Sequence, residues 1–259
     1  IGAYTPGLET RVYQTTQPEF NIRGIVTNDF GIGADPSVAI YVDGVYSGRS
    51  GASLTAFQDV ERVEVLKGPQ GTLFGKNSAA GAIHIITNKP GEEFEATVTS
   101  TLGNYGKQKL EGMVNLPLSD TLFLRLNAMT NERDGYTKNL ANGEDLGNEN
   151  NGGARASLLW DVTETTSVLF QGEYADIDQD SVNKYGLVNG VSGVSDAYGD
   201  LSLDGRNSES MELWGGAITV DSDLGATQFT SITSAKRFES YNAQDEDGTA
   251  IAELYFDSI

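Results

Sequence analysis

The chain has 259 residues, with 37 Asp and Glu against 17 Lys and Arg, and a formal net charge of −20. Because nucleic-acid binding needs concentrated positive charge, this balance argues against a nucleic-acid partner. The chain has no cysteine and one histidine, His84, which rules out disulfides and thiolate ligands and leaves no histidine cluster for a metal.

The first part of the chain predicts a small mixed α/β domain of short strands and long loops. Residues 1–17 carry turn signals and little periodicity. The predicted elements that follow are a strand over Phe20–Val26, a loop over Asn28–Pro36, a strand over Ser37–Val45 that ends at the turn dipeptide Asp43-Gly44, and one helical turn over Leu54–Asp59.

A glycine-rich loop between two predicted strands lies at the centre of this part. The strands are Arg62–Leu66, which alternates polar and apolar residues, and Ala82–Ile86. The loop between them invites a phosphate-binding interpretation, but Gln70 and Asn77 stand where a P-loop requires Gly and Ser or Thr. A compact loop of small residues packed against another surface is the better interpretation.

The run from Arg62 to Pro90 resembles the end of the plug domain of TonB-dependent outer-membrane receptors. Three upstream motifs agree with that family in order and spacing: Asn21–Gly24, Val38–Val45 and Asp59–Arg62. The resemblance implies a plug domain over residues 1–90, truncated at its N-terminus. It also implies that residues 91–259 are the N-terminal part of an outer-membrane β-barrel, truncated at its C-terminus.

After Pro90, segments of about ten residues alternate strictly between apolar and polar. Leu122, Leu124 and Leu126, for example, oppose Arg125 and Asn127. Such a face could meet the second sheet of a soluble sandwich or the lipid around a membrane barrel. The connections favour the barrel because they alternate: Leu118–Thr121, Asp161–Thr165 and Asp221–Gly225 are short, whereas Glu132–Gly152 and Asp176–Ser210 are long. The predicted strands are 92–102, 107–117, 121–131, 153–162, 165–176, 210–221 and 226–240.

The predicted fold class is therefore a mixed α/β plug domain followed by antiparallel transmembrane β-barrel strands. About seven strands cannot close such a barrel, and the resemblance implies about twenty-two around the plug. We expect the chain to be a fragment whose signal peptide and remaining strands lie outside it.

The resemblance implies a TonB-dependent receptor in the outer membrane of a Gram-negative bacterium that actively takes up a scarce nutrient. A ferric siderophore is the first ligand class expected; cobalamin and an oligosaccharide are alternatives, and a soluble β-rich surface binding module or adhesin is the rival class. The implied partners are the TonB energy-transducing complex and the lipid and lipopolysaccharide of the membrane. No catalytic set of residues is apparent, so neither an enzyme nor a cofactor is predicted.

Two groups of site residues are predicted. Arg23, Arg62 and Lys67 are expected to contact the barrel, with Arg23 and Lys67 each pairing with a carboxylate in the lumen; an ordinary surface charge is the alternative. The expected ligand contacts are polar, acidic or aromatic residues of outward plug loops, where Phe30 and Tyr46 could stack on a planar ligand and Arg49 could meet an anionic one. The candidates are Asn28, Asp29, Phe30, Asp35, Tyr46 and Arg49.

An acidic run, Asp176–Asp180, resembles the start of a calcium-binding loop. Ser181 and Leu187 replace the Gly and Glu that such a loop requires, so solvated loop charge is the preferred interpretation and no metal site is predicted.

Overall fold

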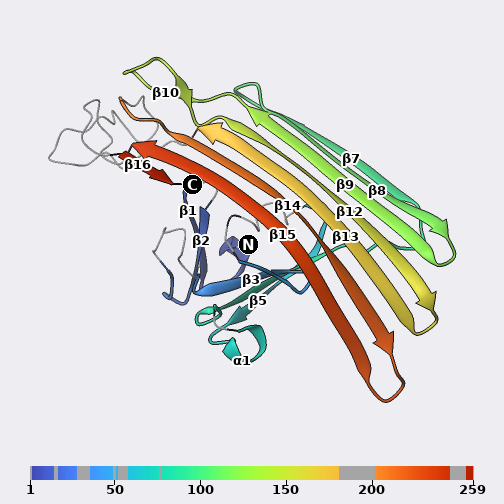
Figure 1. Ribbon diagram of the computed structural model, residues 1–259. Helices are drawn as coiled ribbons and strands as arrows, with labels where there is room; N and C mark the ends of the chain where they lie inside the picture. Colours follow the sequence, from blue (N-terminus) through green and yellow to red (C-terminus); the bar gives the residue numbers. More distant parts are fainter. Residues whose placement is uncertain are drawn as a thin grey trace.

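The structure, a computed structural model, describes residues 2–14, 17–27, 36–48, 51, 58–75, 77–180, 202–245 and 255–258. A small plug built from the N-terminal segments lies on the concave side of a large curved antiparallel sheet built from the rest (Figure 1). Among the described residues, no helix is long and apolar enough to cross a membrane.

The plug consists of a hairpin and a four-stranded mixed sheet. The hairpin pairs β1 (Leu8–Gln14) with β2 (Gln17–Ile22) and follows the short 3-10 helix η1 (Gly2–Tyr4). The sheet has the order β4-β3-β6-β5, with β3 and β6 parallel. Its elements are β3 (Val38–Val42), β4 (Val45–Ser47), β5 (Val60–Lys67), the one-turn helix α1 (Gly71–Phe74) and β6 (Gly81–Thr87).

An apolar core holds these two pieces together. Leu8 and Ile22 of the hairpin are buried against one face of the four-stranded sheet, where Ile40, Ile83 and Ile85 are also buried. Each of these side chains contributes about 1.5 to 3 kcal/mol by leaving water. The plug therefore owes its fold to hydrophobic burial on one face of its sheet.

Two tight turns end strands of the plug. Arg23 and Gly24 have φ of 54° and 84°, and Asp43 and Gly44 have φ of 48° and 82°, as a two-residue hairpin turn requires. The turn at Asp43-Gly44 was predicted correctly. The strand predicted over Phe20–Val26 is too long, because β2 ends at Ile22 and the chain turns at Arg23-Gly24. The strand β1 was not predicted, and most of the helical turn predicted over Leu54–Asp59 lies outside the described residues.

The large sheet contains eight strands in the order β16-β15-β14-β13-β12-β9-β8-β7. The seven predicted strands are all present, most of them longer than predicted, and β16 and the small hairpin β10–β11 were not foreseen. The eight strands are β7 (Glu95–Leu102), β8 (Gln108–Ser119), β9 (Leu122–Arg133), β12 (Glu149–Thr163), β13 (Thr166–Asp180), β14 (Ser208–Asp223), β15 (Gln228–Asp245) and β16 (Tyr255–Ser258). The separate hairpin pairs β10 (Thr137–Lys138) with β11 (Asp145–Leu146).

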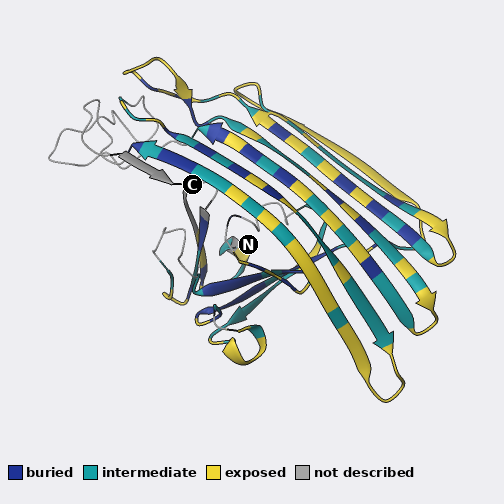
Figure 2. Cartoon of the chain, in the orientation of Figure 1, coloured by how far each residue is buried: buried dark blue, intermediate teal, exposed yellow. Residues whose placement is uncertain are grey.

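The two faces of this sheet are arranged in the opposite way to those of a soluble sandwich. On β9, Phe123, Arg125 and Asn127 are buried toward the plug, whereas Leu126 on the other face is 38% exposed. Buried and exposed residues alternate in the same way along β12 and β13, as Figure 2 shows. The apolar face therefore points away from the molecule and the polar face points inward. This excludes the sandwich alternative, in which the apolar faces would meet each other.

The connections alternate in length as predicted. The turns after β8, β12 and β14 are short and lie together at one end of the sheet, whereas the hairpin β10–β11 lies at the other end (Figure 1). One expectation was wrong: Asp176–Asp180 is not loop but the end of β13, where Ile177 and Gln179 are buried and Asp178 is exposed. These residues belong to the strand because they pair with β14 and continue the alternation of buried and exposed side chains along β13.

Gly81 is the position in the plug where a side chain is least tolerated. A Cβ there would lie 2.2 Å from the carbonyl oxygen of Leu66 and 2.8 Å from Cδ1 of Ile22. We predict that Gly81→Ala lowers the free energy of unfolding of the plug by about 2 to 4 kcal/mol, because β5, β6 and the hairpin must move apart. Gly71→Ala is the control, since a Cβ at Gly71 meets open space. Chemical denaturation of the two variants should separate them; equal stability would contradict the prediction.

Candidate functional site

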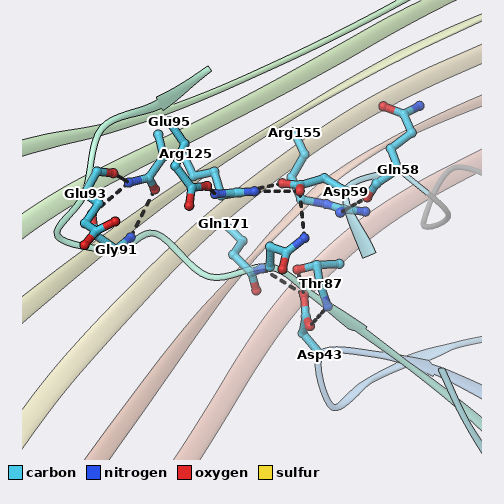
Figure 3. Close-up of polar contacts among 12 residues, drawn as sticks. Asp43, Gln58, Asp59, Thr87, Gly91, Glu93, Glu95, Arg125, Arg155 and Gln171 are labelled. Carbon is cyan, nitrogen blue, oxygen red and sulfur yellow. Dashed lines mark hydrogen bonds and ion pairs between the residues drawn. The ribbon is translucent and has the colours of Figure 1, made fainter. Parts of the chain in front are cut away.

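The candidate site is the contact between the plug and the inner face of the barrel sheet, here called the plug–barrel seam. It is formed by Asp43, Gln58 and Asp59 of the plug and Arg125, Arg155 and Gln171 of the sheet. Figure 3 shows these residues meeting from the two parts of the molecule, with Gln58 contributing its backbone carbonyl. The seam is polar because the inner face of each barrel strand presents the polar half of its alternation.

The strongest contact of the seam joins Asp59 to Arg125. Nε and Nη2 of Arg125 donate to the two carboxylate oxygens of Asp59 at 2.6 and 2.8 Å, and Nη1 donates to Glu95 at 3.2 Å. The Arg125 side chain is 8% exposed and that of Asp59 is 11% exposed. Burial alone would raise the pKa of the Asp59 carboxyl, but hydrogen bonds from Arg125 and Asn88 outweigh it and hold the pKa below its ordinary value. Asp59 therefore docks as a carboxylate.

Asp43 makes a second contact from the turn between β3 and β4. Its carboxylate accepts hydrogen bonds from the backbone N–H of Thr87 at 2.9 Å, from the Thr87 hydroxyl at 2.7 Å and from Nε2 of Gln171 on β13 at 2.9 Å. The turn also approaches β15 closely, since a Cβ on Gly44 would lie 2.7 Å from Cδ1 of Ile232. Glycine at this position thus serves both the left-handed turn and the close approach.

A partly buried charge network supports the seam from the barrel side. Nζ of Lys236 lies 2.6 Å from Oε1 of Glu173, and Nη2 of Arg155 lies 3.9 Å from Oε2. Nη1 of Arg155 donates to the carbonyl oxygen of Gln58 at 3.2 Å. Gly215 lies between Glu173 and Lys236 in the register, and a Cβ there would lie 2.8 Å from Cγ of Lys236. The missing side chain of Gly215 lets Lys236 reach across β14 to Glu173.

The segment that joins plug and barrel is also fixed to the barrel wall. The side chain of Asn115 on β8, 2% exposed, accepts a hydrogen bond from Gly91 N–H and donates to the carbonyls of Gly91 and Glu93. The sheet of the plug ends at Thr87 and the barrel sheet begins at Glu95, so the proposed boundary after residue 90 falls within this joining segment.

The three cations predicted to contact the barrel occupy other positions. Arg23 lies in the turn after β2 with an exposed side chain, and Nζ of Lys67 donates to the carbonyl oxygen of Pro6 at 2.5 Å. Arg62 is paired with Glu61 and Glu64 on its own strand. Among the described residues, none of these three pairs with a barrel carboxylate, and the pairing expected for Arg23 and Lys67 stays a prediction. The seam shown here has the reverse polarity, with carboxylates on the plug and cations on the barrel.

The predicted ligand contacts are only partly described. Asn28, Asp29, Phe30, Asp35 and Arg49 lie outside the described residues. The hydroxyl of Tyr46 accepts a hydrogen bond from Nδ2 of Asn77 at 2.7 Å, and its ring lies 5.4 Å from that of Tyr41. In the part of the chain that the structure describes, no three His, Cys, Asp or Glu residues are grouped as a metal site would require.

The described elements define a class of protein: a plug domain held against the polar inner wall of a β-barrel. Residues 1–82 match the family described as the TonB-dependent receptor plug domain. The chain is 33% identical over 125 residues to the pesticin receptor of Yersinia enterocolitica, an alignment that covers 48% of this chain and 18% of that protein. It is 32% identical over 134 residues to the ferripyoverdine receptor of Pseudomonas aeruginosa, covering 52% of this chain and 16% of that protein.

A solved structure agrees with this match. The ferric yersiniabactin uptake receptor from Yersinia pestis aligns with a TM-score of 0.79 and 21% identity, covering 93% of this chain and 38% of that one. The chain therefore matches the TonB-dependent receptor plug domain over residues 1–82, and its fold is that of a plug domain followed by part of a barrel. It spans less than a fifth of the two receptors compared by sequence, at 18% and 16% of their lengths.

The seam predicts a large effect of removing Arg125. Arg125→Ala leaves the buried Asp59 carboxylate without its main partner, a change that costs about 3 to 5 kcal/mol at buried pairs. We expect the plug of the intact protein to become sensitive to limited proteolysis while the barrel stays folded. Lys138→Ala is the control, because its ion pair with Asp145 joins two exposed side chains of the hairpin β10–β11 and contributes little. Equal protease sensitivity of the two variants would refute the role of Arg125.

Acid should weaken the seam in a defined direction. The folded-state pKa of Asp59 lies below its unfolded value of about 3.9, so its stabilisation is fully present above that value. As the pH falls below about 4 and through the folded pKa, Asp59 takes up a proton and this stabilisation is lost.

Scanning calorimetry of the intact protein at a series of pH values would measure this loss as a falling transition temperature of the plug. The Asp59→Asn variant should start from a lower transition temperature and show a shallower acid decline. An equally steep decline in that variant would assign the acid effect to other carboxylates.

Proposed function

We propose that this chain is part of an outer-membrane receptor that takes up a ferric siderophore with energy supplied through TonB. The observation that carries the proposal is the plug docked on the polar inner wall of the barrel sheet through Asp59 and Arg125. A wide barrel leaves an aqueous lumen, and a plug inside it must be displaced or remodelled before a solute can pass. The names of the relatives, a ferripyoverdine receptor among them, support the ligand class.

The outward face of the sheet supports a membrane location. Phe170, Trp160 and Ile218 are exposed on it, and Tyr174 and Trp214 pair directly across β13 and β14 with exposures of 47% and 49%. Tyrosine and tryptophan favour the interface between the hydrocarbon and the headgroups. We place the outer-membrane lipid against this face and lipopolysaccharide near its rim, on the side of the long connections.

The ligand is proposed to bind where plug loops and long barrel connections face the outside. Asn28, Asp29, Phe30 and Asp35 stand between β2 and β3 in the sequence, and Tyr46 and Arg49 follow the turn at Asp43-Gly44 in the sequence. We keep these residues as the proposed ligand contacts. The plug cations Arg23, Arg62 and Lys67 remain proposed contacts to the rest of the barrel wall.

Uptake by the intact receptor tests the proposal. A deletion strain starved of iron would be supplied with labelled ferric pyoverdine, ferric yersiniabactin or an iron–catecholate complex, with and without the restored gene. We expect uptake of one of these complexes to depend on the gene, to fall to background when residues 28–35 are deleted, and to stop when a protonophore collapses the energy supply.

A variant with Glu164→Ala, a change at an exposed residue of the short turn after β12, provides the control and should take up iron normally. Gene-independent uptake of all three complexes would contradict the siderophore assignment. The same strain would then be tested with cobalamin and with oligosaccharides.

A further inference from the structure

We propose that two separate connections at the end of the barrel opposite the short turns form one recognition platform, with Asn139 as the residue that couples them. The platform consists of the hairpin β10–β11, which connects β9 to β12, and of residues 202–207, which lead into β14. These segments are more than fifty residues apart in the chain and are joined mainly by side-chain-to-backbone hydrogen bonds.

The side-chain amide of Asn139 both donates a hydrogen bond to the backbone of the second connection and accepts one from it. Its Nδ2 donates to the carbonyl oxygen of Leu203 at 2.9 Å, and its Oδ1 accepts the Leu203 N–H at 3.0 Å. Oδ1 also accepts the N–H of Ala141 at 3.1 Å, which fixes the rotamer of the side chain. Asn139 and Leu203 are each 1% exposed. An asparagine amide that pairs with both backbone groups of one residue acts as a short strand would, and water does not reach the pair to replace it.

Both halves of the platform are anchored to the barrel strands. Asp245 at the end of β15 accepts the N–H groups of Asp204 and Gly205 at 3.2 and 3.1 Å. On the other side, Nη2 of Arg133 at the end of β9 donates to the carbonyl oxygen of Gly147 at 2.6 Å. The hairpin itself closes tightly, since a Cβ on Gly135 would lie 2.3 Å from the carbonyl oxygen of Asp145. The platform is thus a rigid bridge over β12 and β13, held at both ends.

The platform lies at the end of the barrel where the ligand is proposed to bind, so we assign it a role in ligand binding. This role rests on the function proposed above. Its outer surface presents Tyr136 and Leu140, which are 39% and 63% exposed, and the Arg133 guanidinium lies 4.9 Å from the centre of the Tyr136 ring. Nη1 of Arg133 lies 2.9 Å from Oε1 of Glu149, and Lys107 pairs with the same carboxylate, so two cations share one anion beside the ring. This excess of positive charge next to an exposed aromatic ring suits a planar, anionic ligand such as an iron complex of a phenolate or catecholate siderophore. Because Asn139 already holds the two segments together, a ligand that stabilises the hairpin also stabilises residues 202–207. Those residues then lose little further conformational entropy when the ligand binds.

Hydrogen–deuterium exchange of the intact, detergent-solubilised protein tests the coupling without any ligand. Asn139→Ala should raise exchange about tenfold or more at residues 202–207 as well as in the hairpin, because two backbone groups of Leu203 lose their partner. Asn142→Ala, in the same hairpin but exposed, is the control and should change exchange only at its tip. If Asn139→Ala alters the hairpin alone, the two connections move independently and the platform is refuted.

A second measurement adds ferric yersiniabactin, ferric pyoverdine or an iron–catecholate complex to the same samples. A complex that binds should protect the hairpin and residues 202–207 together in the wild type, and Asn139→Ala should abolish the protection of residues 202–207 while Asn142→Ala leaves it unchanged. Protection of only one segment in the wild type would overturn the platform. Protection of neither by any complex, with the ligand-free result intact, would overturn its role in siderophore binding while leaving the coupling established.

Discussion

The polarity of the barrel's inner wall is the constraint on which the rest of the structure depends. Strict alternation along each strand sends Arg125 and Arg155 inward and Leu126 and Trp160 outward. A plug that packs against such a wall must offer groups that satisfy buried cations, because a buried charge without a partner is costly. Asp59 meets this requirement by pairing with Arg125, and Asp43 accepts one hydrogen bond from Gln171 while holding Thr87, the last residue of the plug sheet.

The plug is therefore stabilised by two different kinds of interaction. Its own fold rests on an apolar core between the hairpin β1–β2 and the four-stranded sheet, with Ile22, Ile40 and Ile83 at its centre. Its attachment to the wall rests on charged and polar groups, which water solvates well when they separate. Apolar side chains lose free energy when water reaches them, whereas a separated carboxylate and guanidinium are each solvated by water. Breaking the seam therefore leaves the hydrophobic burial inside the plug unchanged.

The sequence predicted the barrel well because the period-two pattern is local. Alternation by itself placed all seven strands and assigned Arg125 to the polar face. It could not supply the partner of Arg125, since Asp59 lies 66 residues away in the chain and nothing in the pattern links the two. Asp43 was recognised only as a turn residue, and its contacts to Thr87 and Gln171 come from the way the turn meets the wall. The strand β1 was missed because residues 1–17 lack periodicity, and its pairing with β2 and its burial through Leu8 are tertiary effects.

The same limit applies at the end of the barrel opposite the short turns, where the connections are long. Connections of that length do not hold a fixed shape by local propensity alone, because their conformational entropy opposes it. Here the order comes from single buried polar side chains, Asn139 and Asp245, which bind the backbone of a distant segment. Each does for a loop what Asp59 does for the plug: a buried group in one segment is satisfied only if a second segment takes one position. The chain thus uses apolar alternation to form its wall, and a few long-range polar contacts to position what lies inside and above that wall.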